Sequence, residues 1–215
     1  MPADEPVHPS FQRLLGGIRK FRREVFPGQR EIYEQAVREG QRPHTLMIAC
    51  ADSRIDPNLF TQSEPGEIFV ARNIGNIVPA YGEMLGGVSA VIEYAVAALG
   101  VQNVVVCGHT DCGAMKGLLD QKTIAAMPTV KTWLRNAEAA LSIVQATYPE
   151  LSGAAVLDEL VEANVVLQMN HLRTHPSVAG KIANGTLTVH GWVYDLAAGM
   201  VRGYAGPARG FSEIE

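Results

Sequence analysis

The sequence predicts an α/β fold: a central parallel sheet of about four strands plus an extra late strand, flanked by helices, with an N-terminal helical arm. Two observations predict it. Short apolar segments rich in β-branched residues alternate with longer segments of helical periodicity, which is typical of parallel sheets with right-handed crossovers. The chain has 215 residues, 47% of them hydrophobic and 19% charged, which is long enough to bury one sizeable core.

The N-terminal arm, residues 1–40, is predicted to be helical and amphipathic. We expect Pro27-Gly28 to break its first helix, and a shorter helix to follow over residues 31–38. Because the arm precedes the first strand, we expect its apolar face to pack on another subunit. The apolar residues with nearly helical spacing are Phe11, Leu14, Leu15, Ile18, Val25 and Phe26.

The remaining chain, residues 41–215, begins with three predicted strands. Residues 45–49 and 67–71 are the first two, and residues 103–107, Asn-Val-Val-Val-Cys, are the third. The third is β-branched and has no polar interruption after its first residue, as expected of a central parallel strand. The nearly all-apolar residues 84–99 are predicted to form a helix that is buried on most sides.

The second half of the chain is predicted to be mainly helical. Residues 130–148 keep a 3.6-residue apolar period over about five turns, and residues 154–172 are expected to form a second helix. Residues 187–201 are then predicted to form a strand, a turn near Ala198-Gly199 and a segment that runs back along the strand.

Composition argues against several classes of protein. The net charge of -4 gives no reason to expect a nucleic-acid partner. No apolar run approaches the roughly 18 residues of a membrane span, and the first ten residues, MPADEPVHPS, have no apolar signal core. Three cysteines, an odd number, favour a reducing compartment over a disulfide framework. We therefore expect a cytoplasmic protein with neither a membrane nor a nucleic acid as partner.

Two motifs carry groups suited to chemistry. The first strand runs into Cys50-Ala51-Asp52-Ser53-Arg54, which places an acid and an arginine directly after a cysteine at the end of a strand. The third strand runs into Cys-Gly-His-Thr-Asp-Cys-Gly, residues 107–113. Ligand sites of open α/β sheets lie beyond the carboxyl ends of strands, so Cys50, His109 and Cys112 converge if the two strands are neighbours.

Two thiolates and an imidazole are a zinc-binding set. Structural zinc sites use four protein ligands, whereas catalytic sites use three and keep one position open. Cys107 is the available fourth ligand, but its place inside an apolar strand favours core packing. A redox pair is the other alternative, and the segment has no C-x-x-C motif to support it. An open, catalytic zinc site is therefore the favoured interpretation.

Together the motifs resemble the β-class carbonic anhydrases, in which C-x-D-x-R is followed by H-x-x-C. The similarity covers roughly residues 40–200 and includes Glu-Pro-Gly-Glu at 64–67, Arg72-Asn73 and His-Gly-Trp-Val-Tyr at 190–194. Some members are regulated through a bicarbonate pocket that uses a tryptophan, an arginine and a tyrosine. Arg72 and Tyr194 match two of these positions, but Met47 stands where the tryptophan would be. The resemblance therefore favours the plant-like, constitutively open type, with Arg72 and Tyr194 serving folding or an interface.

The resemblance implies an enzyme that hydrates carbon dioxide reversibly to bicarbonate and a proton. Zinc would be the cofactor, and zinc-bound hydroxide would attack carbon dioxide, oriented by the catalytic pair Asp52 and Arg54. Arg54 would hold Asp52 through a bidentate pair and keep it off the metal. The implied metal ligands are Cys50, His109 and Cys112, and the implied substrate contacts are Gln41, Phe69, Ile74, Tyr94 and Gly113.

The resemblance also implies a homodimer or higher homo-oligomer whose subunits exchange residues 1–40, leaving residues 41–215 as the catalytic domain. Two rival interpretations stay open at this point. One is a hydrolase on the same scaffold acting on an analogue such as carbon disulfide. The other is a structural-zinc or assembly protein without turnover, which would hold its metal by four protein ligands.

Overall fold

The N-terminal unit is a nearly continuous helix. A computed structural model describes residues 8–83 and 86–214 and divides the chain into two compact units, Met1–Gln41 and Arg42–Glu215. In the first unit, α1 (Pro9–Lys20) passes through a π-helical turn (Phe21–Val25) into α2 (Phe26–Glu39). The expected break at Pro27-Gly28 is wrong. Pro27 stands in the first turn of α2, directly after the π-helical turn, and the helix passes Pro27-Gly28 without ending.

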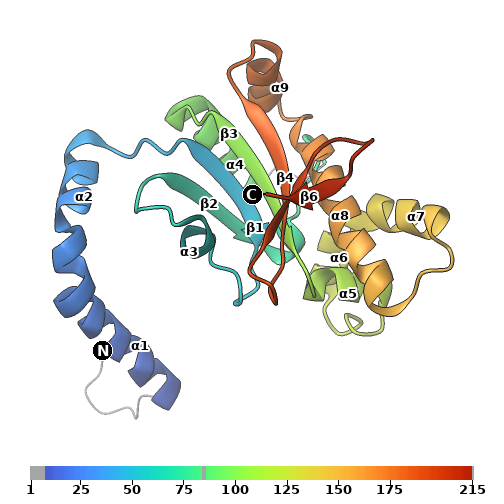
Figure 1. Ribbon diagram of the computed structural model, residues 1–215, viewed down its shortest axis with the longest axis horizontal. Helices are drawn as coiled ribbons and strands as arrows, with labels where there is room; N and C mark the ends of the chain where they lie inside the picture. The colour runs from blue at the N-terminus through green and yellow to red at the C-terminus, as the bar shows by residue number, and fades with distance from the viewer. Residues whose placement is uncertain (1–7, 84–85, 215) are drawn as a thin grey trace. The chain divides into compact units, whose positions relative to one another are not determined.

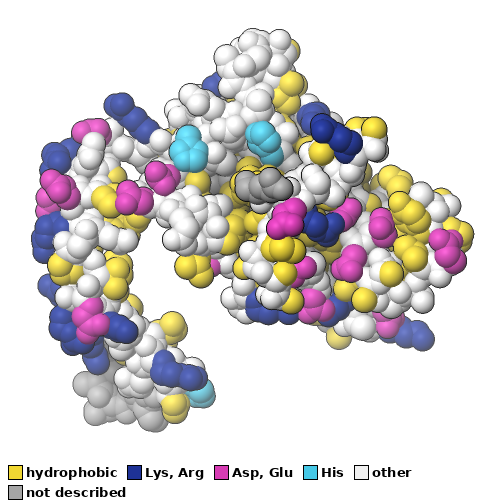
Figure 2. All heavy atoms as spheres, in the orientation of Figure 1, with side chains coloured by type: hydrophobic (Ala, Val, Ile, Leu, Met, Phe, Trp, Pro, Cys, Tyr) yellow, Lys and Arg dark blue, Asp and Glu magenta, His cyan; other side chains and the backbone are white. Residues whose placement is uncertain are grey.

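These helices expose their apolar side chains. None of the described residues in α1, the π-helical turn or α2 is buried, although both α-helices are amphipathic. Figure 2 shows apolar side chains lying between charged ones along them. The large apolar side chains that remain exposed are Phe11, Leu14, Ile18, Phe21, Val25 and Val37.

The second unit contains a six-stranded mixed sheet with the order β2-β1-β3-β4-β5-β6 (Figure 1). The first four strands in this order are parallel, and the last two are antiparallel. The predicted parallel sheet and late return strand are thus present, and a short sixth strand is added. The strands are β1 (Thr45–Cys50), β2 (Ile68–Asn73), β3 (Asn103–His109), β4 (Thr188–Tyr194), β5 (Val201–Tyr204) and β6 (Phe211–Glu213).

The predicted helices of this unit are present with two differences, and helices at 57–61 and 176–183 are added that were not predicted. The expected helix at 130–148 is divided into α6 (Pro128–Leu134), a 3-10 turn (Arg135–Ala137) and α7 (Glu138–Thr147). At this break the Asn136 carbonyl accepts a hydrogen bond from Gln168. The expected helix at 84–99 is α4 followed by a π-helical turn (Tyr94–Leu99), and its first two residues lie outside the described part. The α-helices are α3 (Pro57–Thr61), α4 (Gly87–Glu93), α5 (Gly113–Leu119), α6 (Pro128–Leu134), α7 (Glu138–Thr147), α8 (Gly153–Leu172) and α9 (Pro176–Ala183).

Both faces of the central strands are buried, which explains their uninterrupted apolar sequences. All six residues of β1 are buried. Alternate residues such as Leu46 and Ile48 belong to the main core, whereas Met47 and Ala49 belong to a smaller cluster that includes Cys107. Helix α8 packs on β3 and β4 in the main core. The central strands are therefore fixed from both sides.

Close packing of α8 on the sheet depends on a glycine at the end of β3. A Cβ added to Gly108 would lie 2.7 Å from Val165 Cγ2 on α8. We expect Gly108→Ala to lower the free energy of unfolding by about 1–3 kcal/mol, because an overpacked core must shift side chains or backbone. Urea unfolding measures this. Gly180→Ala in α9 is the matched control, because a Cβ there meets nothing within 4 Å, and it should be neutral or stabilising.

Within the described residues, no helix combines the length and the apolar character needed to cross a membrane.

Candidate active site

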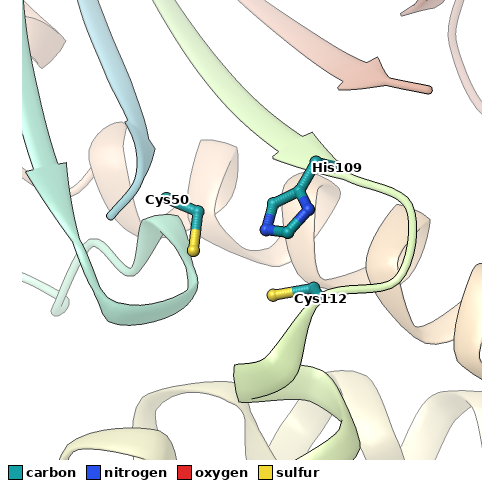
Figure 3. A group of neighbouring side chains, drawn as sticks. All are labelled: Cys50, His109 and Cys112. Atoms are coloured by element: carbon teal, nitrogen blue, oxygen red, sulfur yellow. The ribbon is translucent and has the colours of Figure 1, made fainter. Parts of the chain in front are cut away.

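Three potential metal ligands meet at the carboxyl ends of two neighbouring strands. Cys50 ends β1, His109 ends β3, and Cys112 caps the start of α5. The strands are paired in parallel, with Ala49 opposite Cys107, so their ends lie at one edge of the sheet. Figure 3 shows the three side chains pointing toward one another. Their ligand atoms all lie within 4.8 Å of one another, and the exposed fractions are only 5%, 0% and 1%.

The histidine of this cluster has an unused nitrogen. Nδ1 of His109 donates to the carbonyl of Thr110 at 2.8 Å, which fixes the tautomer with a lone pair on Nε2. Nε2 is buried and has no hydrogen-bond partner. An unpaired buried acceptor is costly, and a histidine that donates its other N–H to a carbonyl is typical of metal ligands. These residues therefore fit a zinc ion by both chemistry and orientation.

The two sulfurs of the cluster interact with each other. A hydrogen bond from the Cys112 thiol lowers the pKa of Cys50 to about 4, against the raising effect of burial. The same pairing, together with burial, raises the pKa of Cys112 above the ordinary thiol range. The Cys112 thiol thus favours a thiolate at Cys50, and a cation held by both sulfurs would take the place of that hydrogen bond, because thiolates are the form that binds metal.

Asp52 lies beside the three potential metal ligands and is oriented by Arg54. The guanidinium of Arg54 donates from Nε to Oδ1 of Asp52 at 2.9 Å and from Nη2 to Oδ2 at 2.8 Å, the bidentate pair expected from the sequence. Oδ2 of Asp52 is 3.9 Å from Nε2 of His109. These hydrogen bonds hold the pKa of Asp52 well below its usual range, so it is an oriented carboxylate at neutral pH.

Asp111 also contacts Arg54, and this contact was not predicted. Nη1 of Arg54 donates to Oδ2 of Asp111 at 2.8 Å, and Lys116 pairs with the other carboxylate oxygen. Asp111 has a left-handed backbone with φ of 60°, a conformation that aspartate tolerates better than most residues. The guanidinium thereby connects the C-x-D-x-R and H-x-x-C segments. The only signal in the sequence was an acidic residue between His109 and Cys112.

Arg72 fixes the backbone of the first motif. Its Nε donates to the carbonyl of Cys50 at 3.1 Å, and its Nη2 donates to the carbonyl of Asp52 at 2.6 Å. The resemblance favoured a role for this arginine in folding or an interface, and its hydrogen bonds are to the backbone of residues 50 and 52. Tyr194 stacks on Phe60, with ring centroids 4.8 Å apart.

Cys107 lies in the smaller core cluster with Met47, Ala49 and Val105 and is fully buried. Burial raises its pKa to about 12, which keeps it a neutral thiol. Within the described residues, it is not among the three side chains that could together hold a metal ion. Its environment is that of a small apolar side chain.

The expected substrate contacts are placed less uniformly. Phe69 and Tyr94 form an aromatic pair with centroids 6.1 Å apart, and Tyr94 is half exposed. Ile74 is 43% exposed and directly precedes Gly75, whose N–H reaches Cys50 Sγ at 3.4 Å. Gly113 is the first residue of α5, next to Cys112. Gln41 is exposed and is the last residue of the N-terminal unit.

Known proteins resemble this chain over nearly its whole length. A family model described as carbonic anhydrase matches residues 45–201. A carbonic anhydrase of Pseudomonas aeruginosa is 47% identical over 201 residues, which cover 94% of this chain and 90% of that protein. One of Synechocystis is 43% identical over 201 residues, covering 93% of this chain and 73% of that protein.

Solved structures show the same similarity. The β-carbonic anhydrase CcaA superimposes with a TM-score of 0.93 at 41% identity, covering 97% of this chain and 93% of that one. A tetrameric β-carbonic anhydrase of Sordaria macrospora superimposes with a TM-score of 0.83 at 28% identity, covering 93% and 98%. Sequence, fold and the cluster of Cys50, His109 and Cys112 all lead to one assignment. The chain belongs to the carbonic anhydrase family, in its β class.

Proposed function

We propose that this enzyme interconverts carbon dioxide and bicarbonate at a zinc site formed by Cys50, His109 and Cys112. The observation that carries the proposal is the buried, unpaired Nε2 of His109, which faces two sulfurs within 4.8 Å. When bound, zinc supplies a Lewis acid that makes water acidic enough to act as a nucleophile near neutral pH. The chain's own residues then bind the reactants, orient them and hold their protons.

Asp52 accepts a hydrogen bond from the attacking water and so turns a lone pair of that water toward carbon dioxide. Its position 3.9 Å from Nε2 of His109 supports this role. Arg54 uses both carboxylate oxygens of Asp52, which keeps the carboxylate ionised and directed. Asp111 holds Arg54 from the other side, so the orienting pair is fixed to both motifs.

The proposed substrate contacts divide between apolar and polar groups. Phe69, Ile74 and Tyr94 offer apolar surface suited to a nonpolar gas. Phe69 is partly buried and pairs with Tyr94, and Ile74 directly precedes Gly75, whose N–H reaches Cys50 Sγ. Gln41 has an amide that donates to a bicarbonate oxygen, and Gly113 leaves room at the start of α5 because it has no side chain.

The separation of Cys107 from the cluster favours an open site over a structural one. A structural zinc site needs a fourth protein ligand. Cys107 packs in another cluster, and Arg54 holds both oxygens of Asp52.

We also place the enzyme in the cytoplasm. None of the three cysteines forms a disulfide, which supports a reducing compartment.

Stopped-flow measurement of carbon dioxide hydration, combined with metal analysis of the same preparation, tests the proposed function. We expect about one zinc per chain, and hydration that falls with zinc content on chelation and returns when zinc is restored. A preparation loaded with zinc that does not hydrate carbon dioxide would refute the proposal. A screen with carbon disulfide on that same preparation would then identify the rival hydrolase.

We further propose that residues 1–40 pack on a second copy of the chain, giving a homodimer or higher homo-oligomer. The arm buries none of its described residues and exposes large apolar ones, and exposed apolar surface of this kind marks interfaces. The tetrameric relative from Sordaria macrospora is consistent with an assembly. Residues 41–215 are then the catalytic domain.

The double substitution Leu14→Glu, Ile18→Glu is expected to reduce the oligomer to a smaller species, because it places charge on the apolar face of α1. Size-exclusion chromatography with light scattering measures the mass. Arg13→Ala, Lys20→Ala alters net charge by the same amount on the polar face of α1 and should leave the mass unchanged. An unchanged mass in both variants would contradict the arm's proposed role.

A further inference from the structure

Helix α8 carries a stripe of polar side chains that the proposed reaction does not use. Asn164, Gln168 and His171 follow one another at spacings of four and three residues, so they lie on one face of an otherwise largely apolar helix. Asn164 is 1% exposed and Gln168 is fully buried. Buried amides are costly unless their hydrogen bonds are made, so this stripe requires specific partners.

All three side chains bind the backbone of residues 75–78, which follow β2. Nδ2 of Asn164 donates to the carbonyl of Gly75 at 3.1 Å. Oε1 of Gln168 accepts from the N–H of Val78 at 2.9 Å, and Nδ1 of His171 donates to the Val78 carbonyl at 2.9 Å. Nε2 of Gln168 also donates to Oδ1 of Asn164 at 2.8 Å, which joins the two amides into one network.

The bound segment has a conformation that needs external support. Gly75 and Asn76 both have left-handed backbones, with φ of 76° and 47°. A Cβ on Gly75 would lie 3.0 Å from Cβ of Ala114, so the segment also approaches α5 closely. Trp133 adds a further hydrogen bond, from Nε1 to the carbonyl of Ile74 at 2.8 Å. Glycine adopts such a backbone freely, whereas in Asn76 it is uncommon and persists where surrounding groups hold it in place.

This segment contacts one of the three potential metal ligands, Cys50, through a hydrogen bond. The N–H of Gly75 donates to Sγ of Cys50 at 3.4 Å, while the carbonyl of the same residue is held by Asn164. Hydrogen bonds to metal-binding side chains orient them and tune the metal, and their loss typically costs 10–100-fold in metal affinity or activity. The position of the Gly75 N–H is therefore linked to α8 by consecutive hydrogen bonds.

We propose that Asn164 and Gln168 are positioning residues for the metal site. They hold residues 75–78 so that the Gly75 amide donates to the Cys50 sulfur, and they thereby set the strength of the bond between Cys50 and the metal. The proposal rests on Cys50 being a zinc ligand, as in the proposed function.

Asn164→Leu is the direct test, because leucine has a similar volume and cannot donate to the Gly75 carbonyl. We expect zinc loss to a chelator to accelerate by about tenfold, the lower end of the usual range for such outer residues. In the cobalt-substituted protein, we expect the thiolate-to-cobalt charge-transfer band to shift. Asn170→Leu is the control: Asn170 lies on the same helix, is exposed and accepts a hydrogen bond only from Arg173 among the described contacts. It should alter neither measurement.

A folded Asn164→Leu protein with unchanged zinc loss and an unchanged cobalt band would overturn the proposal. If Asn164→Leu does not fold, Gln168→Met takes its place, because methionine has a similar length but cannot accept from the Val78 N–H or donate to Asn164. The same two changes, smaller in size, are expected there, and the absence of both would overturn the proposal. Neither readout depends on turnover. If zinc loss and the cobalt band both change in the variant, while the zinc-loaded unsubstituted protein does not hydrate carbon dioxide, the positioning role is retained and the proposed function is rejected.

Discussion

Replacement of His109 by alanine is expected to remove zinc from the enzyme and to lower kcat/KM for hydration by at least about a thousandfold. The imidazole supplies the buried, unpaired Nε2 of the cluster, and without it only two of the three protein ligands that a catalytic zinc site uses remain. Metal catalysis typically supplies several kcal/mol of transition-state stabilisation, and each 1.4 kcal/mol is about tenfold in rate. Metal analysis and stopped-flow hydration measure the two effects.

His190→Ala is the matched control for this substitution. His190 lies on β4, and the hydrogen bonds of its ring are to Thr188 and Asn103 near the amino-terminal ends of the strands. We expect this variant to keep its zinc and its hydration rate. A His109→Ala protein that retains both stoichiometric zinc and turnover would contradict the assignment of the ligands.

Asp52→Asn is expected to retain zinc and to lose about a hundredfold or more in kcat. The amide keeps the shape of the carboxylate but presents an N–H where the charged acceptor stood, so it cannot orient water in the proposed way. Losing a group that accepts or orients a proton in the transition state typically costs 10²–10⁴-fold. The measurement is stopped-flow hydration on protein with verified zinc content.

Asp56→Asn provides the comparison for Asp52→Asn. Asp56 lies four residues further on and caps α3 by accepting from the N–H of Leu59 at 3.3 Å. Asparagine is an equally good cap, so neither stability nor turnover should alter noticeably. If Asp52→Asn hydrates carbon dioxide as fast as Asp56→Asn, Asp52 does not have its proposed role.

The parts of the fold that could be predicted are those where one segment carries its own signal. The run from Thr45 to Cys50 is apolar because both faces of β1 are buried, and its neighbour β3 is β-branched for the same reason. Once the strands are adjacent, the cysteine and histidine at their ends must meet. The sequence thus placed Cys50 and His109 at strand ends, and the pairing of β1 with β3, which the prediction had to assume, brings them together with Cys112.

The features that could not be predicted depend on partners distant in the sequence or on fine backbone geometry. Asn164 binds the backbone of Gly75, and a backbone carbonyl leaves no trace in residue type. Arg54 reaches Asp111 across 57 positions, and the sequence does not show which distant carboxylate lies beside an arginine. Pro27-Gly28 is usually a breaker, but within the first turn of α2 the proline fits. The triplet Phe211–Glu213 is too short for a periodic signal, so β6 was missed.

The most direct test of the zinc site is X-ray absorption at the zinc edge of the purified enzyme. The account predicts two sulfur ligands at about 2.3 Å and two lighter ligands at about 2.0–2.1 Å, one from His109 and one from solvent. Substituting Cys107 by serine should leave the spectrum unchanged. A third sulfur in the first shell, lost in that variant, would show a closed structural site and contradict an open catalytic one.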